Sequence, residues 1–265
     1  IAGHRRYTAL RASMLQCLVA ALALSSGRAF VGRGIAVRGA STVRAAKKKK
    51  AKAKQELKRA ELPAGAARPK LIVFDLDNTL WQPELYQMRG KKPKANKDIK
   101  LTAGALDALH DLAGDGWEKT QAAVASRATA TDWAEKLLAD FKLDHGQSIA
   151  TLLPYREIYE GNKRKHLQRI REASGVAYCD MIFFDDYTEN LGDAAHLGVM
   201  GVHCPRGLTH EHWEGGLKAY ARLKAQDTSF MGRMFTPVWK STSELGSADE
   251  ATETTSRRWR GASEI

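Results

Sequence analysis

Cysteine is scarce in this sequence of 265 residues, which holds three: Cys17, Cys179 and Cys204. They form no Cys-x-x-Cys pair, so the sequence excludes a disulfide framework and predicts free thiols in a reducing compartment. His203-Cys204 and His210-x-His212 offer metal ligands, but no second ligand pair follows at a suitable spacing. A zinc site is therefore not expected.

Acidic residues are absent from the first 55 positions. Residues 1–70 hold 17 Lys and Arg against Glu56 and Glu61, whereas the remaining 195 residues hold 25 basic and 28 acidic side chains. The formal charge of +12 therefore belongs to the amino-terminal segment. Because the rest is mildly acidic, the high isoelectric point does not indicate that a folded domain binds nucleic acid.

No apolar run near the amino terminus is long enough to cross a bilayer, which needs roughly 20 residues. Met14–Leu24 follows an arginine-bearing segment and is typical of the core of a signal peptide. Ser25-Ser26-Gly27-Arg28-Ala29 follows, with small residues at the positions that a signal peptidase reads, then Phe30 and an acid-poor, Arg-bearing segment typical of a transit peptide. This order resembles the two-part leaders of proteins imported into plastids by algae with complex plastids. We therefore expect plastid import, with the secretory pathway, or the cytoplasm if the start of the sequence is misassigned, as alternatives.

A dense basic run comprises Lys47–Lys50, Lys52, Lys54 and Lys58. Such clusters can neutralise nucleic-acid phosphates. No aromatic residue interleaves with these lysines to stack on bases, so a solvated linker or the end of the transit segment is the favoured interpretation. We expect residues 1–68 to be a targeting leader and Lys-rich linker, disordered or removed, and residues 225–265 to be a flexible tail.

Strands and helices alternate between residues 69 and 224, the expected domain. The expected strands are Leu71–Phe74, Ala122–Ala125, Ser148–Leu153, Met181–Phe184 and Val199–Cys204. The expected helices are Thr102–Ala113, Thr131–Phe141, Lys163–Ser174, Asn190–Leu197 and Glu214–Leu223. This alternation predicts an α/β fold, a doubly wound three-layer parallel sheet with helices on both faces.

Two carboxylates follow the apolar strand at 71–74, Asp75 and Asp77. Residues two apart in a strand face the same way, so both carboxylates can converge where open parallel sheets place their chemistry. Such close like charges need a cation or a phosphate-bearing substrate to balance them. The alternative is a strand that ends in a turn, with both aspartates bonded to the backbone.

Further polar side chains follow other expected strands: Ser126, Asp185 and Asp186. Lys163 begins a helix after Gly161-Asn162. Each of these four residues also has a purely structural interpretation, as a strand end, a helix cap or part of a solvated face. Together they suit phosphoryl transfer, with oxygen ligands for magnesium from Asp75, the Asp77 carbonyl and Asp186, supported by Asp185.

Four blocks resemble the haloacid dehalogenase superfamily, and most closely its magnesium-dependent, acid phosphatase-like family. They are DLDNTLW at 75–81, ASR at 125–127, REIYEGNK at 156–163 and MIFFDD at 181–186. The resemblance implies a phosphoric monoester hydrolase with nucleophile Asp75 and acid/base Asp77, acting through an aspartyl-phosphate on phosphotyrosine proteins or sugar phosphates. It implies Mg²⁺ as cofactor. The residues implied to bind the substrate phosphate are Leu76, Asp77, Ser126, Arg127 and Lys163.

The sequence departs from this family pattern at three places, one of which is Ser148–Tyr155, a segment longer than expected. Ala128 stands where the family usually has Thr, and residues 82–100, where the family has a hairpin flap, are rich in lysine. Neither gap between motifs is long enough for a large cap domain, so we expect an open site. Lysines at 91, 92, 94 and 97 would then favour an anionic substrate.

We expect a phosphorylated small molecule or protein as the partner, with no nucleic acid and no membrane span. Two other functions stay open: a module that binds phosphorylated ligands without turnover, and a basic nucleic-acid-associated protein.

Overall fold

The computed structural model describes residues 56–226, 238–241 and 244. The predicted signal peptide, the transit-like segment and all of the basic run except Lys58 lie outside these residues, as does most of the predicted tail. Among the helices that are described, none is long and apolar enough to cross a membrane.

A six-stranded sheet with the strand order β5-β4-β1-β6-β7-β8 lies at the centre, and every neighbouring pair is parallel. Its strands are β1 (Leu71–Phe74), β4 (Gln121–Ser126), β5 (Tyr155–Ile158), β6 (Met181–Asp185), β7 (Met200–His203) and β8 (Val238–Trp239). Phe74 pairs with Val124 on β4 and with Phe184 on β6. The carboxyl ends of these three strands are therefore level at one edge of the sheet.

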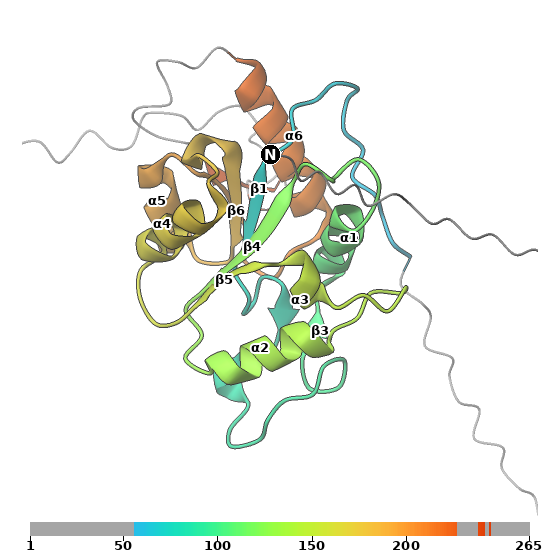
Figure 1. Ribbon diagram of the computed structural model, residues 1–265, viewed down its shortest axis with the longest axis vertical. Coiled ribbons are helices and arrows are strands. Elements are labelled where there is room, and N and C mark those ends of the chain that lie inside the picture. The colour runs from blue at the N-terminus through green and yellow to red at the C-terminus, as the bar shows by residue number, and fades with distance from the viewer. Residues whose placement is uncertain (1–55, 227–237, 242–243, 245–265) are drawn as a thin grey trace, which may run out of the picture. The chain divides into compact units, whose positions relative to one another are not determined.

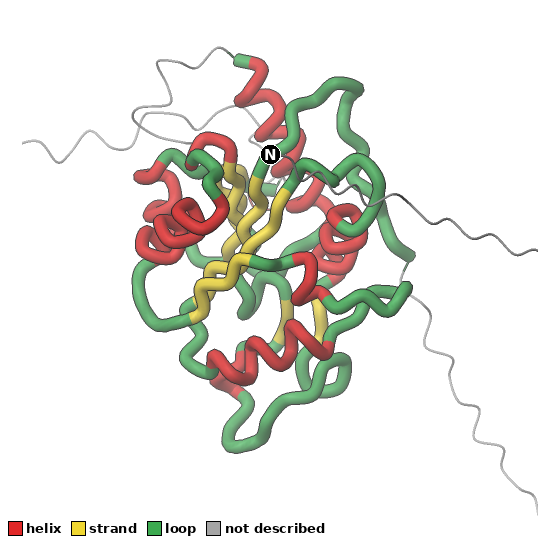
Figure 2. The backbone as a smooth tube through the Cα atoms, viewed as in Figure 1, coloured by secondary structure: helices red, strands yellow, loops and turns green. Residues whose placement is uncertain are grey.

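Helices cover both faces of the sheet (Figures 1 and 2). They are α1 (Ala103–Leu112), α2 (Thr131–Asp140), α3 (Ile149–Leu152), α4 (Lys163–Ser174), α5 (Thr188–Leu197) and α6 (His210–Ala225), with short 3₁₀ turns η1 (Leu85–Gln87) and η2 (Tyr178–Asp180). Ile72 and Phe74 pack with residues of α1, α2 and α6, whereas Leu71 and Val73 pack with residues of α4 and α5. Burial on both faces explains the purely apolar run of β1, and the predicted three-layer fold is confirmed.

The helix that carries Lys163 has the bounds that the sequence predicts. Asn162 caps α4 because its side chain accepts a hydrogen bond from the backbone N–H of Lys165 at 3.1 Å. Gly175 ends the helix with φ at 71°, the left-handed conformation that glycine adopts without a Cβ penalty. These two local signals fix where Lys163 enters the site.

A small antiparallel pair, β2 (Trp81–Gln82) and β3 (Lys100–Leu101), stands apart from the main sheet. We call the connecting residues 83–99 the flap. Leu85, Pro93 and Ile99 are buried in it, so apolar contacts hold the flap against the domain. In the described part of the chain no large cap domain covers the edge where β1, β4 and β6 end.

The strand predicted at Ser148–Leu153 is wrong. Residues Ile149–Leu152 form the short helix α3, and the strand beside β4 is instead Tyr155–Ile158. Since β5 is an edge strand with three half-buried residues, it lacks the apolar run that marks the central strands. Arg156 on this strand bonds to the carbonyls of Ala150 and Leu153 and thereby fixes the end of α3.

Segments beyond both predicted domain boundaries contact the domain. The backbone N–H groups of Lys58 and Ala60 donate to Asp107 at 2.9 Å and to Asp111 at 3.0 Å, both on α1. At the other end, β8 pairs with β7 and extends the sheet, so Val238–Trp239 does not behave as a free tail. The contacts of residues 58–60 were not predicted, and they join part of the expected linker to the domain.

Candidate active site

The structure brings the predicted polar residues to one edge of the sheet. Asp75 directly follows β1, Ser126 ends β4 and Asp185 ends β6. The Asp75 N–H donates to the carbonyl of Phe184 at 2.9 Å, which continues the pairing of β1 with β6 past the last paired residues. The predicted convergence of Asp75, Ser126 and Asp185 at this edge follows from the parallel register.

Lys163 occupies the centre of this cluster. Its Nζ donates to Asp75 Oδ1 at 2.6 Å, to the Ala125 carbonyl at 2.5 Å and to Asp185 Oδ2 at 3.1 Å. Lys163 is 0 % exposed, so its ammonium group lacks water and depends on these three acceptors. Burial alone would lower its pKa, but Asp75 and Asp185 raise the pKa above the ordinary value. Lys163 is therefore a fixed cation inside the site, and the solvated-face reading is wrong for it.

Asp185 contacts Lys163 and the segment that follows β6, and its predicted support of a metal site stays a prediction. Its carboxylate accepts from the Tyr187 N–H at 2.8 Å and from Asn190 Nδ2 at 2.9 Å, besides Lys163. The N-cap of α5 is Tyr187, and no side chain caps the helix, so the interpretation of Asp185 and Asp186 as helix caps is wrong, although Asn190 in the first turn donates to Asp185. Asn190 was not predicted as a site residue, and its only signal was its place five residues after Asp185.

Burial disfavours the ionised forms of Asp75 and Asp186. Burial raises the pKa of Asp75 to about 8, against the opposing effect of Lys163. Burial, together with Asp185, raises the pKa of Asp186 to about 6. Both acids therefore favour a nearby cation.

The donors at this edge fit a hard divalent cation. Asp75 directly follows β1 and Asp186 directly follows β6, which pairs with β1, so both residues belong to the same edge of the sheet. Among the described residues no group of three or more His, Cys, Asp or Glu side chains is placed to hold a metal ion. Two carboxylates and a backbone carbonyl leave room for the waters that Mg²⁺ retains, and they do not suit zinc.

The Asp77 carboxylate is directed to the flap. Its Oδ1 accepts from Trp81 Nε1 at 2.6 Å and from the Leu85 N–H at 3.2 Å. Burial raises the pKa of Asp77, and these two donors only partly oppose that effect. Asn78 follows with φ at 55° and turns the chain, while its side chain bonds to Glu84 and Asp186. We call Asp75, Asp77, Asp185 and Asp186 the acidic cluster. Residues 77 and 78 therefore connect the start of the flap to this cluster.

The other predicted phosphate ligands have less specific surroundings. Leu76 is buried and its carbonyl accepts from the N–H groups of Thr79 and Trp81. Ser126 is 1 % exposed, and its Oγ accepts from the Ala128 N–H at 3.3 Å, as expected of a residue that ends a strand. Arg127 is exposed beside it. Their part in phosphate binding stays a prediction.

His203 contacts the loop that follows β6 and carries Asp186, and it was missed by the sequence reasoning. Its ring contacts the Asp186 carbonyl through Nε2 at 3.1 Å and Glu244 Oε2 through Nδ1 at 2.6 Å. The other carboxylate oxygen of Glu244 contacts His212 Nε2 at 3.2 Å. No local sequence pattern predicts the contact between His203 and Glu244, because these residues are 41 positions apart.

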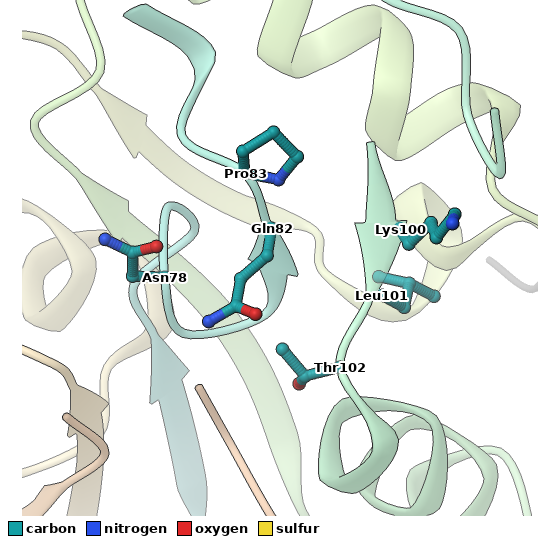
Figure 3. A pocket seen from close by; sticks show the side chains of 6 residues that line it. All are labelled: Asn78, Gln82, Pro83, Lys100, Leu101 and Thr102. Atoms are coloured by element: carbon teal, nitrogen blue, oxygen red, sulfur yellow. The ribbon is translucent and has the colours of Figure 1, made fainter. Parts of the chain in front are cut away.

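Two cavities border the flap. One of about 420 Å³ is lined by residues 78, 82, 83 and 100–102, and none of the four predicted site aspartates lines it. Figure 3 shows the Gln82 amide between Asn78 and Thr102, while Lys100 points away from them. A second, of about 450 Å³, is lined by residues 87–89, 91–94, 97 and 98 of the flap itself.

Comparisons with known proteins agree with this arrangement. A family model described as acid phosphatase matches residues 67–223. The chain is 31 % identical over 169 residues to magnesium-dependent phosphatase 1 of Homo sapiens, covering 60 % of this chain and 91 % of that protein. It is 30 % identical over 146 residues to a HAD-like hydrolase superfamily protein of Schizosaccharomyces pombe, covering 49 % of this chain and 83 % of the relative.

Among solved structures, a haloacid dehalogenase-like hydrolase from Xanthomonas campestris matches with a TM-score of 0.44 and 11 % identity. The match covers 62 % of this chain and 100 % of that one.

Proposed function

This chain belongs to the acid phosphatase family of the haloacid dehalogenase superfamily, and we propose that it hydrolyses phosphate monoesters through an aspartyl-phosphate on Asp75. The coarser conclusion, a magnesium-dependent phosphatase, follows from the family and from the relative of that name. The observation that carries the finer proposal is the buried Lys163, whose Nζ lies 2.6 Å from Asp75 Oδ1 at the open edge of the sheet.

Asp75 is suited to be the nucleophile because an ionised carboxylate needs no base to attack phosphorus. Two anions repel, however, so the attack requires positive charge at the same place. Lys163 supplies one fixed charge, and Mg²⁺ held by Asp75, Asp186 and the Asp77 carbonyl would screen the carboxylate from the phosphoryl group. A carboxylate oxygen of Asp75 then forms a bond to phosphorus as the bond to the leaving oxygen breaks.

Asp77 is suited to the proton transfers. Its raised pKa favours the protonated form that can donate to the leaving oxygen. When water later attacks the aspartyl-phosphate, Asp77 takes a proton from that water, and phosphate departs as the Asp75 carboxylate is restored. The Trp81 and Leu85 donors hold the Asp77 side chain in place for both steps.

We propose a phosphorylated protein, with phosphotyrosine as the reactive group, as the substrate class. The support is the open edge: in the described residues no large cap domain separates the acidic cluster from a macromolecule. A sugar phosphate is the other substrate class that the family suggests.

Hydrolysis of p-nitrophenyl phosphate tests the reaction. We expect turnover with MgCl₂, none with EDTA, and a loss of turnover in Asp75→Asn. Asp115→Asn is the matched control because Asp115 is an exposed aspartate after α1. Binding of p-nitrophenyl phosphate with no turnover at any magnesium concentration would favour the phospho-ligand-binding module instead, and full activity in Asp75→Asn would refute the nucleophile.

A further inference from the structure

The flap and the strand that follows it carry a concentration of positive charge. The cationic residues are Arg89, Lys91, Lys92, Lys94, Lys97 and Lys100, all exposed. Across the described residues, no salt bridge involves any of the six. Two acidic residues lie in the flap: Asp98 accepts a hydrogen bond from the backbone N–H of Lys94 at 2.9 Å, and Glu84 accepts one from the Asn78 side chain. The flap therefore presents charge that the described part of the domain does not neutralise.

These cations stand on a fixed support. Leu85 is 2 % exposed and Ile99 is 0 % exposed, so both ends of the flap are anchored in the core. Between them, the Lys94 carbonyl accepts from the N–H groups of Asp98 and Ile99, which closes a tight turn. The cavity of about 450 Å³ lies within this segment, and five of its lining side chains are cationic. Preorganised charges lose less conformational entropy when they bind an anion than charges on a mobile segment would.

The support is joined to the catalytic edge. The Leu85 N–H donates to the Asp77 carboxylate at 3.2 Å, and the next residue, Tyr86, is 73 % exposed. On the other side, Tyr187 follows Asp186 and is 51 % exposed. In the described chain these two are the large hydrophobic side chains that remain exposed, and each adjoins a residue of the site. Exposed tyrosines beside charged groups are typical of surfaces that bind protein segments.

The charge of the domain outside the flap favours a short anionic ligand over a long one. Residues 71–265 hold 25 basic and 28 acidic side chains, of which residues 89–100 hold six basic and one acidic. Within the described residues 71–226, the positions outside 89–100 carry 14 basic and 21 acidic side chains. A long polyanion such as a nucleic acid would extend over this acidic remainder and be repelled, whereas a short acidic segment would meet only the flap.

We propose that the flap is a docking site for a short acidic segment of a phosphorylated protein substrate, located beside the phosphorylated residue. Aspartate and glutamate side chains of that segment pair with Lys91, Lys92, Lys94 and Lys97, while Tyr86 and Tyr187 contact the segment at the entrance to the site. This assignment rests on the proposed phosphatase function and names its substrate more closely. Because the flap charges are solvated, they act mainly on encounter and on the choice of substrate, and salt weakens them.

A pair of phosphotyrosine peptides tests this docking site: one with four acidic residues beside the phosphotyrosine, and one with glutamines in their place. For the wild type at low salt we expect kcat/KM to be about tenfold higher for the acidic peptide, and the ratio to approach unity in 0.5 M NaCl at about a 4 Å Debye length. The variant Lys91→Gln/Lys92→Gln/Lys94→Gln/Lys97→Gln should show a ratio near one at low salt. The control Lys119→Gln/Lys142→Gln/Arg222→Gln/Lys240→Gln removes four exposed charges elsewhere and should keep the wild-type ratio.

Binding without turnover separates this proposal from the phosphatase function. A fluorescein-labelled peptide with four acidic residues and no phosphate should bind the wild type and the control, and several-fold more weakly the flap variant, by fluorescence anisotropy. Failure to hydrolyse p-nitrophenyl phosphate with magnesium would refute the phosphatase function and would leave the docking site to be judged from the binding measurement. Equal rates for the two phosphopeptides in the wild type, or tighter binding of a single-stranded oligonucleotide than of the acidic peptide, would overturn the docking site.

Discussion

Lysine occurs in two opposite settings around the same site. Lys163 is 0 % exposed and contacts two carboxylates and a carbonyl, whereas the flap lysines at 91, 92, 94 and 97 are exposed and lack a salt bridge within the described residues. A buried charge must be paired because its desolvation is costly, while an exposed charge keeps its water. This difference underlies the two roles that we propose for lysine, in the chemistry where it is buried and in the choice of substrate where it is exposed.

The largest effect should come from removing the partner of the buried lysine. Asp75→Asn keeps the size of the side chain and a hydrogen-bond acceptor for Lys163 but loses the nucleophile. We expect kcat to fall by at least about 10³-fold with the fold retained. Steady-state kinetics on p-nitrophenyl phosphate and circular dichroism check both statements. A decrease of less than tenfold would separate Asp75 from the bond-making step.

Replacing the two kinds of lysine by methionine compares the settings directly. Lys163→Met leaves the Asp75 and Asp185 carboxylates buried without their cation, so the free energy of unfolding should fall by about 3–5 kcal/mol. Activity should fall with it. Lys97→Met, on the exposed flap, should change the free energy of unfolding by less than about 0.5 kcal/mol. Urea denaturation measures both, and similar losses for the two variants would contradict the contrast.

A smaller effect should follow from replacing His203, which contacts the loop that carries Asp186. His203→Gln weakens the contacts of residue 203 with the Asp186 carbonyl and with Glu244, so the loop that carries Asp186 should be held less firmly. We expect the affinity for Mg²⁺ to fall by about 10–100-fold. Magnesium titration of the phosphatase activity measures this affinity. His145→Gln, which removes an exposed histidine, is the control and should leave it unchanged.

The smallest effect that we expect is on the pH dependence of the stabilisation by Mg²⁺. Burial raises the pKa of Asp75 from its ordinary value of 3.8 to about 8, so the folded, metal-free protein disfavours the ionised carboxylate. Its stabilising contribution is complete below pH 3.8 and is lost as the pH rises towards about 8. Mg²⁺ offsets that loss, and the increase in Tm on adding MgCl₂ should be greater at pH 8.5 than at pH 5. An equal increase at both values, measured by differential scanning fluorimetry, would contradict the cause assigned to the shift.

Much of the arrangement of strands and helices was predictable because the sequence signals for it are local. The run Leu71–Phe74 is apolar at every position, and Asn162 and Gly175 mark both ends of α4. Parallel strands then place Asp75, Ser126 and Asp185 at one edge with no further information. Lys163 was predicted to reach this edge for the same reason.

The rest depends on contacts between distant segments. Tyr155–Ile158 was missed because an edge strand with Arg156 and Glu157 lacks the pattern of a buried one. The direction of the Asp77 carboxylate depends on the flap, and the contact of His203 depends on Glu244, far along the chain. Tertiary packing, and not local propensity, determines this edge strand and these side-chain contacts.

A crystal structure of the protein grown with beryllium fluoride and MgCl₂ tests most directly whether Asp75 accepts the phosphoryl group. We predict a beryllium atom bonded to a carboxylate oxygen of Asp75, with Lys163 Nζ beside its fluorides and magnesium between Asp75 and Asp186. Beryllium bonded to another side chain, or an unmodified Asp75 beside bound magnesium, would contradict covalent transfer to this residue.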